Sequence, residues 1–115
     1  MLSVHIWKVN DLAIVECEGR IVRSEAAFKL RQAVTSQEHS HVILLDLSGV
    51  SAVEGGGLGM LLFLQRWAYD QGIRLKLVNP TKSVRDRLEL ANSIPDFEVI
   101  APDEMQAVLA PAQHR

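Results

Sequence analysis

The sequence predicts an α/β fold, a single domain with a mixed, largely parallel sheet of four to five strands and about four helices. Segments that suit strands alternate with segments whose apolar residues recur every three or four positions, as in amphipathic helices. One strand, residues 42–47, is apolar on both faces, which is typical of a central strand covered on both sides. This alternation implies right-handed crossovers and parallel pairing.

Length and composition indicate one globular unit. The 115 residues suit one domain that can bury a core, and we assign residues 1–115 to it, with 110–115 as a frayed tail. The hydrophobic fraction of 48% and the charged fraction of 23% are those of a folded chain. A net charge of −2 provides no basic field for nucleic acid.

Targeting and redox features point to the cytoplasm. The first twenty residues lack the pattern of a secretory signal, and the longest apolar run, Met60 to Leu64, is too short to insert into a membrane. The lone cysteine, Cys17, cannot form an internal disulfide and is expected to be a small buried side chain.

The N-terminal part is expected to form a hairpin followed by a helix. Strands at 4–9 and 12–18 flank Asn10-Asp11, a pair that tolerates tight turns, and Gly19 is expected to end the second strand. Ser24 is the expected cap of the helix. Its apolar positions have helical spacing: Ala26, Ala27, Leu30, Ala33 and Val34.

The remaining elements follow strand 42–47 and a loop that runs from Ser48 to the glycines. A helix is expected from about Leu58 to Gln71, ended by Gly72 in the left-handed conformation. The later elements are a strand at 74–78, a helix capped by Thr81 or Ser83 with Val84, Leu88 and Ala91 buried, a strand at 97–100 and a helix from Pro102 to about Leu109.

The stretch VEGGGLGM, residues 53–60, holds four of the seven glycines. A Walker phosphate loop would need Lys and Ser or Thr where Leu58 and Gly59 stand, and the dinucleotide fingerprint would need glycine at Leu62. An anion site at the helix start remains open, although Glu54 would repel an anion. The simpler interpretation is a turn with a glycine cap, in which Glu54 complements the positive helix end.

The chain resembles the STAS domain of sulfate transporters and anti-sigma factor antagonists. In that family an apolar strand ends in Asp-Leu-Ser, and a loop with Asp-Ser-Ser-Gly-Leu-Gly leads into an amphipathic helix. Glu18-Gly19-Arg20-Ile21 is similar to the family's turn after the second strand, so the resemblance covers essentially the whole chain. The other matching residues are Asp46, Leu47, Ser48, Gly57, Leu58, Gly59, Gly72, Leu75, Val78 and Leu88.

The chain departs from the family at the position that matters for regulation. In the antagonists an anti-sigma kinase phosphorylates the second serine of that loop, which here is Gly56. The regulatory loop has therefore lost its phosphoacceptor, and the loop consists of Glu54, Gly55, Gly56 and Gly57. Val22 replaces a second family carboxylate. Ser48 and Ser51 remain as candidate substitute sites.

No catalytic or metal site is expected. His39 and His41 could share a face of an extended segment, but no third ligand lies nearby in the sequence, and a polar loop is the better interpretation. Asp46 is expected to hydrogen-bond loop backbone. No nucleophile, base and orienting group can be assigned, so we expect no enzyme activity and no cofactor.

The helix after the glycines is apolar around about two-thirds of its circumference. Its expected core face holds Leu58, Leu61, Leu62, Ala68 and Tyr69, while Met60, Phe63, Leu64 and Trp67 widen it. Other helices could cover this surplus, or it could bind a partner. Because related antagonists bind partners around this loop and helix, the resemblance implies a partner site at Leu58, Met60, Phe63 and Trp67.

The expected function is that of a non-catalytic regulatory protein-interaction module, resembling anti-sigma factor antagonists in transcriptional signalling. Its partner would be an anti-sigma kinase or another regulator, and a homodimer remains open. The alternatives are a small-molecule or nucleotide sensor that uses the loop amides, or a STAS subunit of a transport system.

Overall fold

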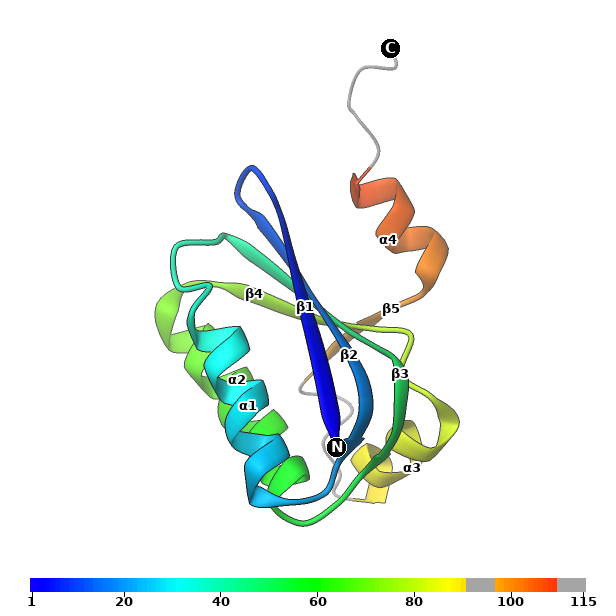
Figure 1. Cartoon of the computed structure of the whole chain (residues 1–115). Helices are drawn as coiled ribbons and strands as arrows, with labels where there is room; N and C mark the ends of the chain where they lie inside the picture. Colours follow the sequence, from blue (N-terminus) through cyan, green and yellow to red (C-terminus); the bar gives the residue numbers. More distant parts are fainter. Residues whose placement is uncertain (91–96, 110–115) are drawn as a thin grey trace.

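A five-stranded sheet with the strand order β1-β2-β3-β4-β5 forms the centre of the computed structural model, which describes residues 1–90 and 97–109 (Figure 1). β1 pairs antiparallel with β2, and every other neighbouring pair is parallel. The strands are β1 (Leu2–Val9), β2 (Leu12–Ile21), β3 (Val42–Val53), β4 (Arg74–Val78) and β5 (Glu98–Ile100). The helices are α1 (Ser24–Thr35), α2 (Gly56–Gln71), α3 (Lys82–Leu90) and α4 (Pro102–Leu109). The predicted mixed sheet and four helices are confirmed, whereas the expected frayed tail and Ala91 lie outside the described residues.

Three strands are longer than the sequence predicted: β1 begins at Leu2 instead of Val4, and β2 and β3 extend further at their C-terminal ends. β2 does not end at Gly19, because this residue takes a φ of 119° that favours glycine and the chain continues in the sheet to Ile21. β3 continues past Ser48 to Val53, so most of the predicted loop is strand. The far halves of β2 and β3 stay paired through two irregularities in register, between Glu16 and Glu18 and between Gly19 and Arg20.

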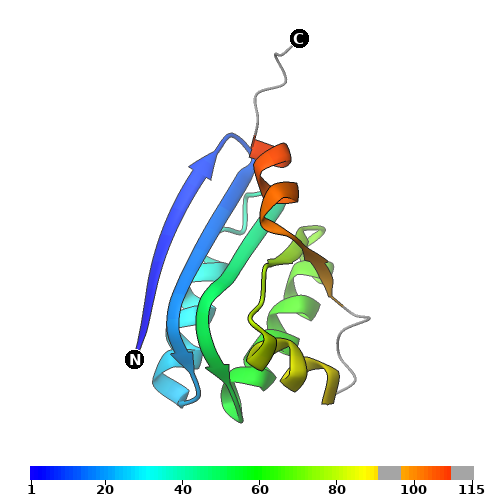
Figure 2. The same cartoon turned by 90° about the vertical axis from the view of Figure 1, so that its right-hand side faces the viewer.

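Helices cover both faces of the sheet, but unequally. The main core lies on one face and includes buried residues of α1, α2 and α3, such as Leu30, Leu61 and Leu88. On the other face α4 covers a smaller cluster (Figure 2). That cluster consists of Ile14, Leu44, Val78 and Ile100, with Met105 of α4 packed against it. The prediction that residues 42–47 are covered on both sides is therefore confirmed for Leu44 and its neighbours.

The predicted stop at Gly72 and the predicted cap at Thr81 are confirmed, whereas the predicted cap at Ser24 is wrong. Gly72 ends α2 with a φ of 73°, and its amide donates to the carbonyl of Tyr69 at 3.1 Å. The hydroxyl oxygen of Thr81 accepts from the Val84 amide at 3.4 Å and caps α3. Ser24 does not cap α1: it is already the first helical residue, and Arg23 at the cap position makes no side-chain cap bond. No described helix is long and apolar enough to cross a membrane.

Candidate functional site

The glycine loop joins β3 to α2 and lies against the end of β2. The Glu54 amide donates to the carbonyl of Ile21 at 3.2 Å, which fixes the loop to the sheet. Gly55 is the N-cap of α2, with φ 53° and ψ −121°, a conformation that residues with a Cβ rarely adopt. The Gly57 amide donates to the carbonyl of Glu54 at 2.9 Å. The predicted glycine cap is thus confirmed, and it is Gly55.

Two of the four glycines, Gly55 and Gly57, are required, each for a different reason. Gly57 is buried, and a Cβ there would overlap the carbonyl oxygen of Ile21. Gly55 is required by its backbone angles, although the space around it is open. Gly56 and Gly59 have negative φ, and a Cβ on either would meet no atom within 4 Å. The loop therefore presents bare backbone to solvent at position 56, the place where a serine side chain would fit.

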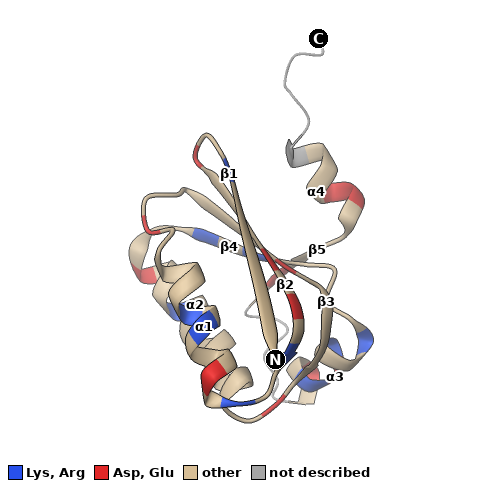
Figure 3. Ribbon diagram, viewed as in Figure 1, with Lys and Arg blue, Asp and Glu red and all other residues tan. Residues whose placement is uncertain are grey.

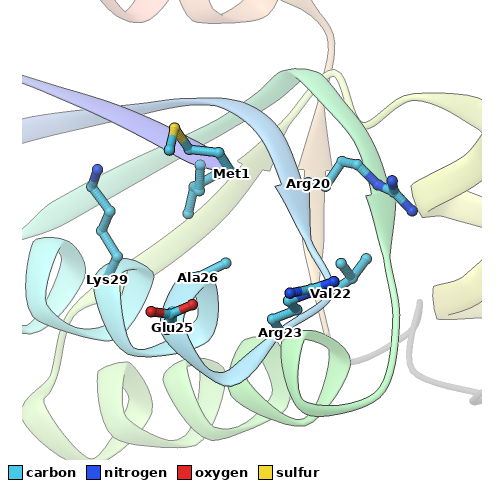
Figure 4. A pocket seen from close by; sticks show the side chains of 8 residues that line it. Met1, Arg20, Val22, Arg23, Glu25, Ala26 and Lys29 are labelled. Carbon is cyan, nitrogen blue, oxygen red and sulfur yellow. The ribbon is translucent and has the colours of Figure 1, made fainter.

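A pocket of about 430 Å³ lies between the start of β1, the end of β2 and the first turns of α1 (Figure 4). Val22, where the resemblance implies a replaced carboxylate, lies in its wall and follows Ile21, whose carbonyl accepts the Glu54 amide of the glycine loop. Three basic residues also line the pocket: Arg20, Arg23 and Lys29. Figure 4 shows that Arg20 points away from the other two and that Glu25 lies between Arg23 and Lys29, so the basic groups do not converge on one point.

The faces of α2 are not distributed as the sequence suggested. The buried residues are Gly57, Leu61, Leu64 and Ala68. Leu58, Met60 and Trp67 are half-buried and pack against the main core. Leu62 and Tyr69, expected on the core face, are instead 37% and 77% exposed. The apolar pattern runs around most of the helix, so the sheet and α1 decide which side is covered.

An exposed surface follows α2 from the glycine loop onward. We name it the α2 outer face, and it comprises Gly59, Leu62, Phe63, Arg66 and Tyr69. Phe63 is 44% exposed, and the guanidinium of Arg31 from α1 lies over its ring, 5.3 Å from the centroid. Arg66 forms an ion pair with Asp70 at 3.2 Å. Basic and acidic residues are interspersed over the described elements (Figure 3).

Ser48 and Ser51, the candidate substitute sites for phosphorylation, lie on β3 and not in the loop where they were expected. The Ser48 amide and hydroxyl both donate to Asp46, at 2.9 and 2.7 Å. The Ser51 hydroxyl donates to the carbonyl of Gly19 at 3.4 Å. Asp46 therefore bonds the backbone as predicted, but from within a strand.

On the face of the sheet opposite the main core, His5 lies close to Ser48 and Asp46, and the sequence analysis did not predict this. His5, Asp46 and Ser48 line the same shallow pocket of about 200 Å³, together with Glu16 and Glu18. No hydrogen bond among the described residues links His5 to Ser48 or Asp46, and the Ser48 hydroxyl donates to Asp46 instead. The proximity follows from two pairings together, His5 with Glu16 on β2 and Glu16 with Asp46 on β3.

Cys17 belongs to the main core, on the other face of the sheet from His5 and Asp46, and is buried, as predicted. Burial, and secondarily the negative charge of Asp46, raise the pKa of Cys17 to about 12. The thiol is therefore protonated at neutral pH and is a poor nucleophile.

The two histidines do not form a metal site. His39 lies in a turn rather than on an extended segment, and His41 pairs through Nδ1 with Asp11 Oδ2 at 3.2 Å. Within residues 1–90 and 97–109 no three His, Cys, Asp or Glu side chains are grouped so that they could hold a metal ion.

The fold is similar to those of solved anti-sigma factor antagonists. An antagonist from Mycobacterium paratuberculosis is 18% identical, with a TM-score of 0.77 and 96% of each chain covered. A putative antagonist from Thermotoga maritima is 20% identical, with a TM-score of 0.78 over 93% of this chain and 95% of that one. Unphosphorylated SpoIIAA is 16% identical, with a TM-score of 0.75 over 93% and 96% of the two chains. At these identities the likeness establishes the fold.

Sequence comparison leads to the same family. No curated protein matches the chain. Residues 13–93, which include the glycine loop and α2, match the family model described as "Mlab, STAS domain". The resemblance noted in the sequence is thereby confirmed, and the chain belongs to this STAS family.

Proposed function

We propose that the chain is a non-catalytic regulatory module of the cytoplasm that binds a protein partner through the glycine loop and the α2 outer face. One observation carries the proposal: Leu62, Phe63 and Tyr69 are exposed on one helix that starts at a loop of bare, exposed backbone. Exposed aromatic and aliphatic side chains beside accessible backbone are typical of protein-binding surfaces. Leu58, Met60 and Trp67, the other apolar residues of the helix, pack against the core and hold α2 in place beneath this surface.

Binding is proposed to be independent of phosphorylation in the loop. Phosphoryl transfer needs an oxygen nucleophile, and Gly55, Gly56 and Gly57 offer none. Ser48 is a poor substitute, because its hydroxyl donates to Asp46, whose negative charge would oppose a phosphate. The solved SpoIIAA structures include a phosphorylated and an unphosphorylated form. This chain would instead keep the same affinity for its partner whether or not a kinase and ATP are present.

The partner class is an anti-sigma kinase or another regulator, and the test uses proteins encoded by neighbouring genes. Each candidate is purified and titrated into the chain by calorimetry. We expect Leu62→Asp and Tyr69→Asp to weaken binding of the true partner at least about tenfold, because a buried anchor is lost and a charge is desolvated. Leu90→Asp on α3 is the matched control: Leu90 is 78% exposed, as Tyr69 is 77% exposed, and this change should leave the affinity unaltered.

The results of these titrations distinguish between the possible binding sites and between the possible functions. A partner that binds all three variants equally well would refute the α2 outer face as the site. A transporter subunit as partner would favour the transport alternative over the transcriptional one. In a second arm the chain is incubated with a candidate kinase and ATP and analysed by mass spectrometry. We expect no modification and an unchanged affinity, whereas phosphate on Ser48 or Ser51 with loss of binding would contradict this expectation.

A further inference from the structure

β1 is an edge strand whose outer side carries no neighbour in the described chain. The strand order places it at one margin of the sheet, and Figure 2 shows β2 on one side of it and no strand or helix of the described chain on the other. It is eight residues long, whereas β5 at the other margin has three. Proteins usually protect such edges with proline, charges, bulges or short strands. β1 contains no proline, has Lys8 as its only Lys or Arg, and pairs with β2 without a shift in register.

The ladder with β2 determines which backbone groups of β1 are free. The Arg20 amide donates to the carbonyl of Met1 at 3.2 Å, and residue pairs in an antiparallel ladder alternate between bonded and non-bonded. The odd-numbered residues of β1 therefore bond β2, which agrees with Val9 and Leu12 closing the two-residue turn. The N–H and C=O groups of the even-numbered residues point away from β2: Leu2, Val4, Ile6 and Lys8.

Side chains along this edge are unusually apolar for an exposed strand. Ile6, Trp7 and Val9 are 42%, 57% and 45% exposed, and all three are large hydrophobic residues. The Trp7 indole donates to Glu16 at 3.0 Å, which holds the ring over the face of the sheet opposite the main core. An added strand would satisfy the free backbone groups and cover these side chains at once.

We propose that β1 pairs with β1 of a second copy of the chain, in antiparallel orientation, so that one sheet continues through both copies. A twofold axis at His5 pairs more of the outward-facing residues than an axis at Val4 or Ile6 does. In this register Val4 lies opposite Ile6 of the second copy, Leu2 opposite Lys8, and Ser3 opposite Trp7. The strand is self-complementary in this register. The apolar residues Val4 and Ile6 meet each other, and Lys8, the only lysine of β1, meets a leucine and not a second lysine.

This dimer goes beyond the proposed function and leaves its surface free. α1 contacts both β1 and α2, so it separates the edge from the α2 outer face. Substitutions on one surface should not affect binding at the other. Failure of the dimer and failure of the partner site can thus be distinguished.

Sedimentation over a wide range of concentrations tests the dimer. We expect a monomer–dimer equilibrium for the unmodified chain. Ile6→Pro should raise the dissociation constant at least about tenfold, because the lost N–H points to the second copy and not to β2. Ile6→Ala keeps the N–H and should raise it less, and circular dichroism shows whether each variant is folded. A chain that stays monomeric throughout, or a folded Ile6→Pro that associates like the unmodified chain, would overturn the proposal.

Disulfide trapping tests the register independently of any folding defect. Residue 5 faces itself in a non-hydrogen-bonded pair, whose Cβ atoms lie about 4.5–5.5 Å apart, near the span of a disulfide. We expect His5→Cys to form covalent dimers on mild oxidation. Ser3→Cys and Trp7→Cys should not do so singly but should crosslink when mixed. Self-crosslinking of Ser3→Cys or Trp7→Cys as readily as His5→Cys would refute the register.

Discussion

The carbonyl oxygen of Ile21 occupies the space that a Cβ on residue 57 would need. Gly57 therefore lets the start of α2 approach the end of β2 more closely than any other residue could. The same carbonyl accepts the Glu54 amide at 3.2 Å, so one backbone group of β2 lies against both ends of the glycine loop. The loop therefore packs closely on the end of β2.

This contact predicts opposite effects for two similar substitutions in α2. Gly57→Ala should destabilise the fold by about 3 kcal/mol or more, because backbone atoms must move apart. Gly59→Ala should stabilise it by up to about 1 kcal/mol, because Gly59 faces open space and alanine favours the helix. Urea unfolding of the two variants measures both changes. A neutral Gly57→Ala would mean that the loop does not approach β2 this closely.

The two exposed glycines of the loop should respond differently to serine. Gly55→Ser should cost about 1–3 kcal/mol, because residue 55 has a φ of 53° and a ψ of −121°. Gly56→Ser should change the free energy of unfolding by less than about 0.5 kcal/mol, because its side chain enters open space. Denaturant melts of the pair provide the comparison. Equal losses for both would contradict the assignment of the cap to Gly55.

Much of the fold could be predicted from the sequence because local patterns and tertiary structure agree. The hairpin turn at Asn10, the stop at Gly72 and the cap at Thr81 all rest on backbone chemistry that acts within a few residues. The order of the elements and the largely parallel sheet follow from the alternation of strand-like segments with segments whose apolar residues have helical spacing.

The errors arose where long-range contacts decide the structure. Ser48-Gly49 resembles the start of a loop, yet pairing with β2 keeps residues 48–53 in the sheet. Leu62 and Tyr69 fit an apolar helix face, but the face that α2 buries is set by β2, β4 and α1. The resemblance predicts that Gly56 stands at the family's phosphoacceptor position, whereas the separate roles of Gly55, Gly56 and Gly57 required the backbone geometry.

Two of the three aromatic residues of α2, Trp67 and Phe63, should differ in how much they contribute to stability. Trp67 is half-buried and packs against the main core, so Trp67→Ala should cost at least about 2 kcal/mol of unfolding free energy. Phe63 is 44% exposed and contacts Arg31, so Phe63→Ala should cost less than about 1 kcal/mol. Chemical unfolding followed by circular dichroism suits both variants, since it does not rely on Trp67 fluorescence. Similar costs would place both rings in the same environment, contrary to the structure.

Cys17 should make stability depend on alkaline pH. Burial, with a smaller contribution from the charge of Asp46, raises the pKa of Cys17 from 9.0 to about 12. The unfolded thiol therefore ionises first as pH rises, while the folded thiol keeps its proton. Its contribution to stability is complete below about pH 9 and is lost between about pH 9 and 12, at up to about 1.4 kcal/mol per pH unit. Other groups titrate in this range too, so the measured quantity is the difference between the unmodified chain and Cys17→Ala in urea unfolding. The alanine variant should lose less stability as pH rises, and parallel pH profiles for the two proteins would contradict the raised pKa.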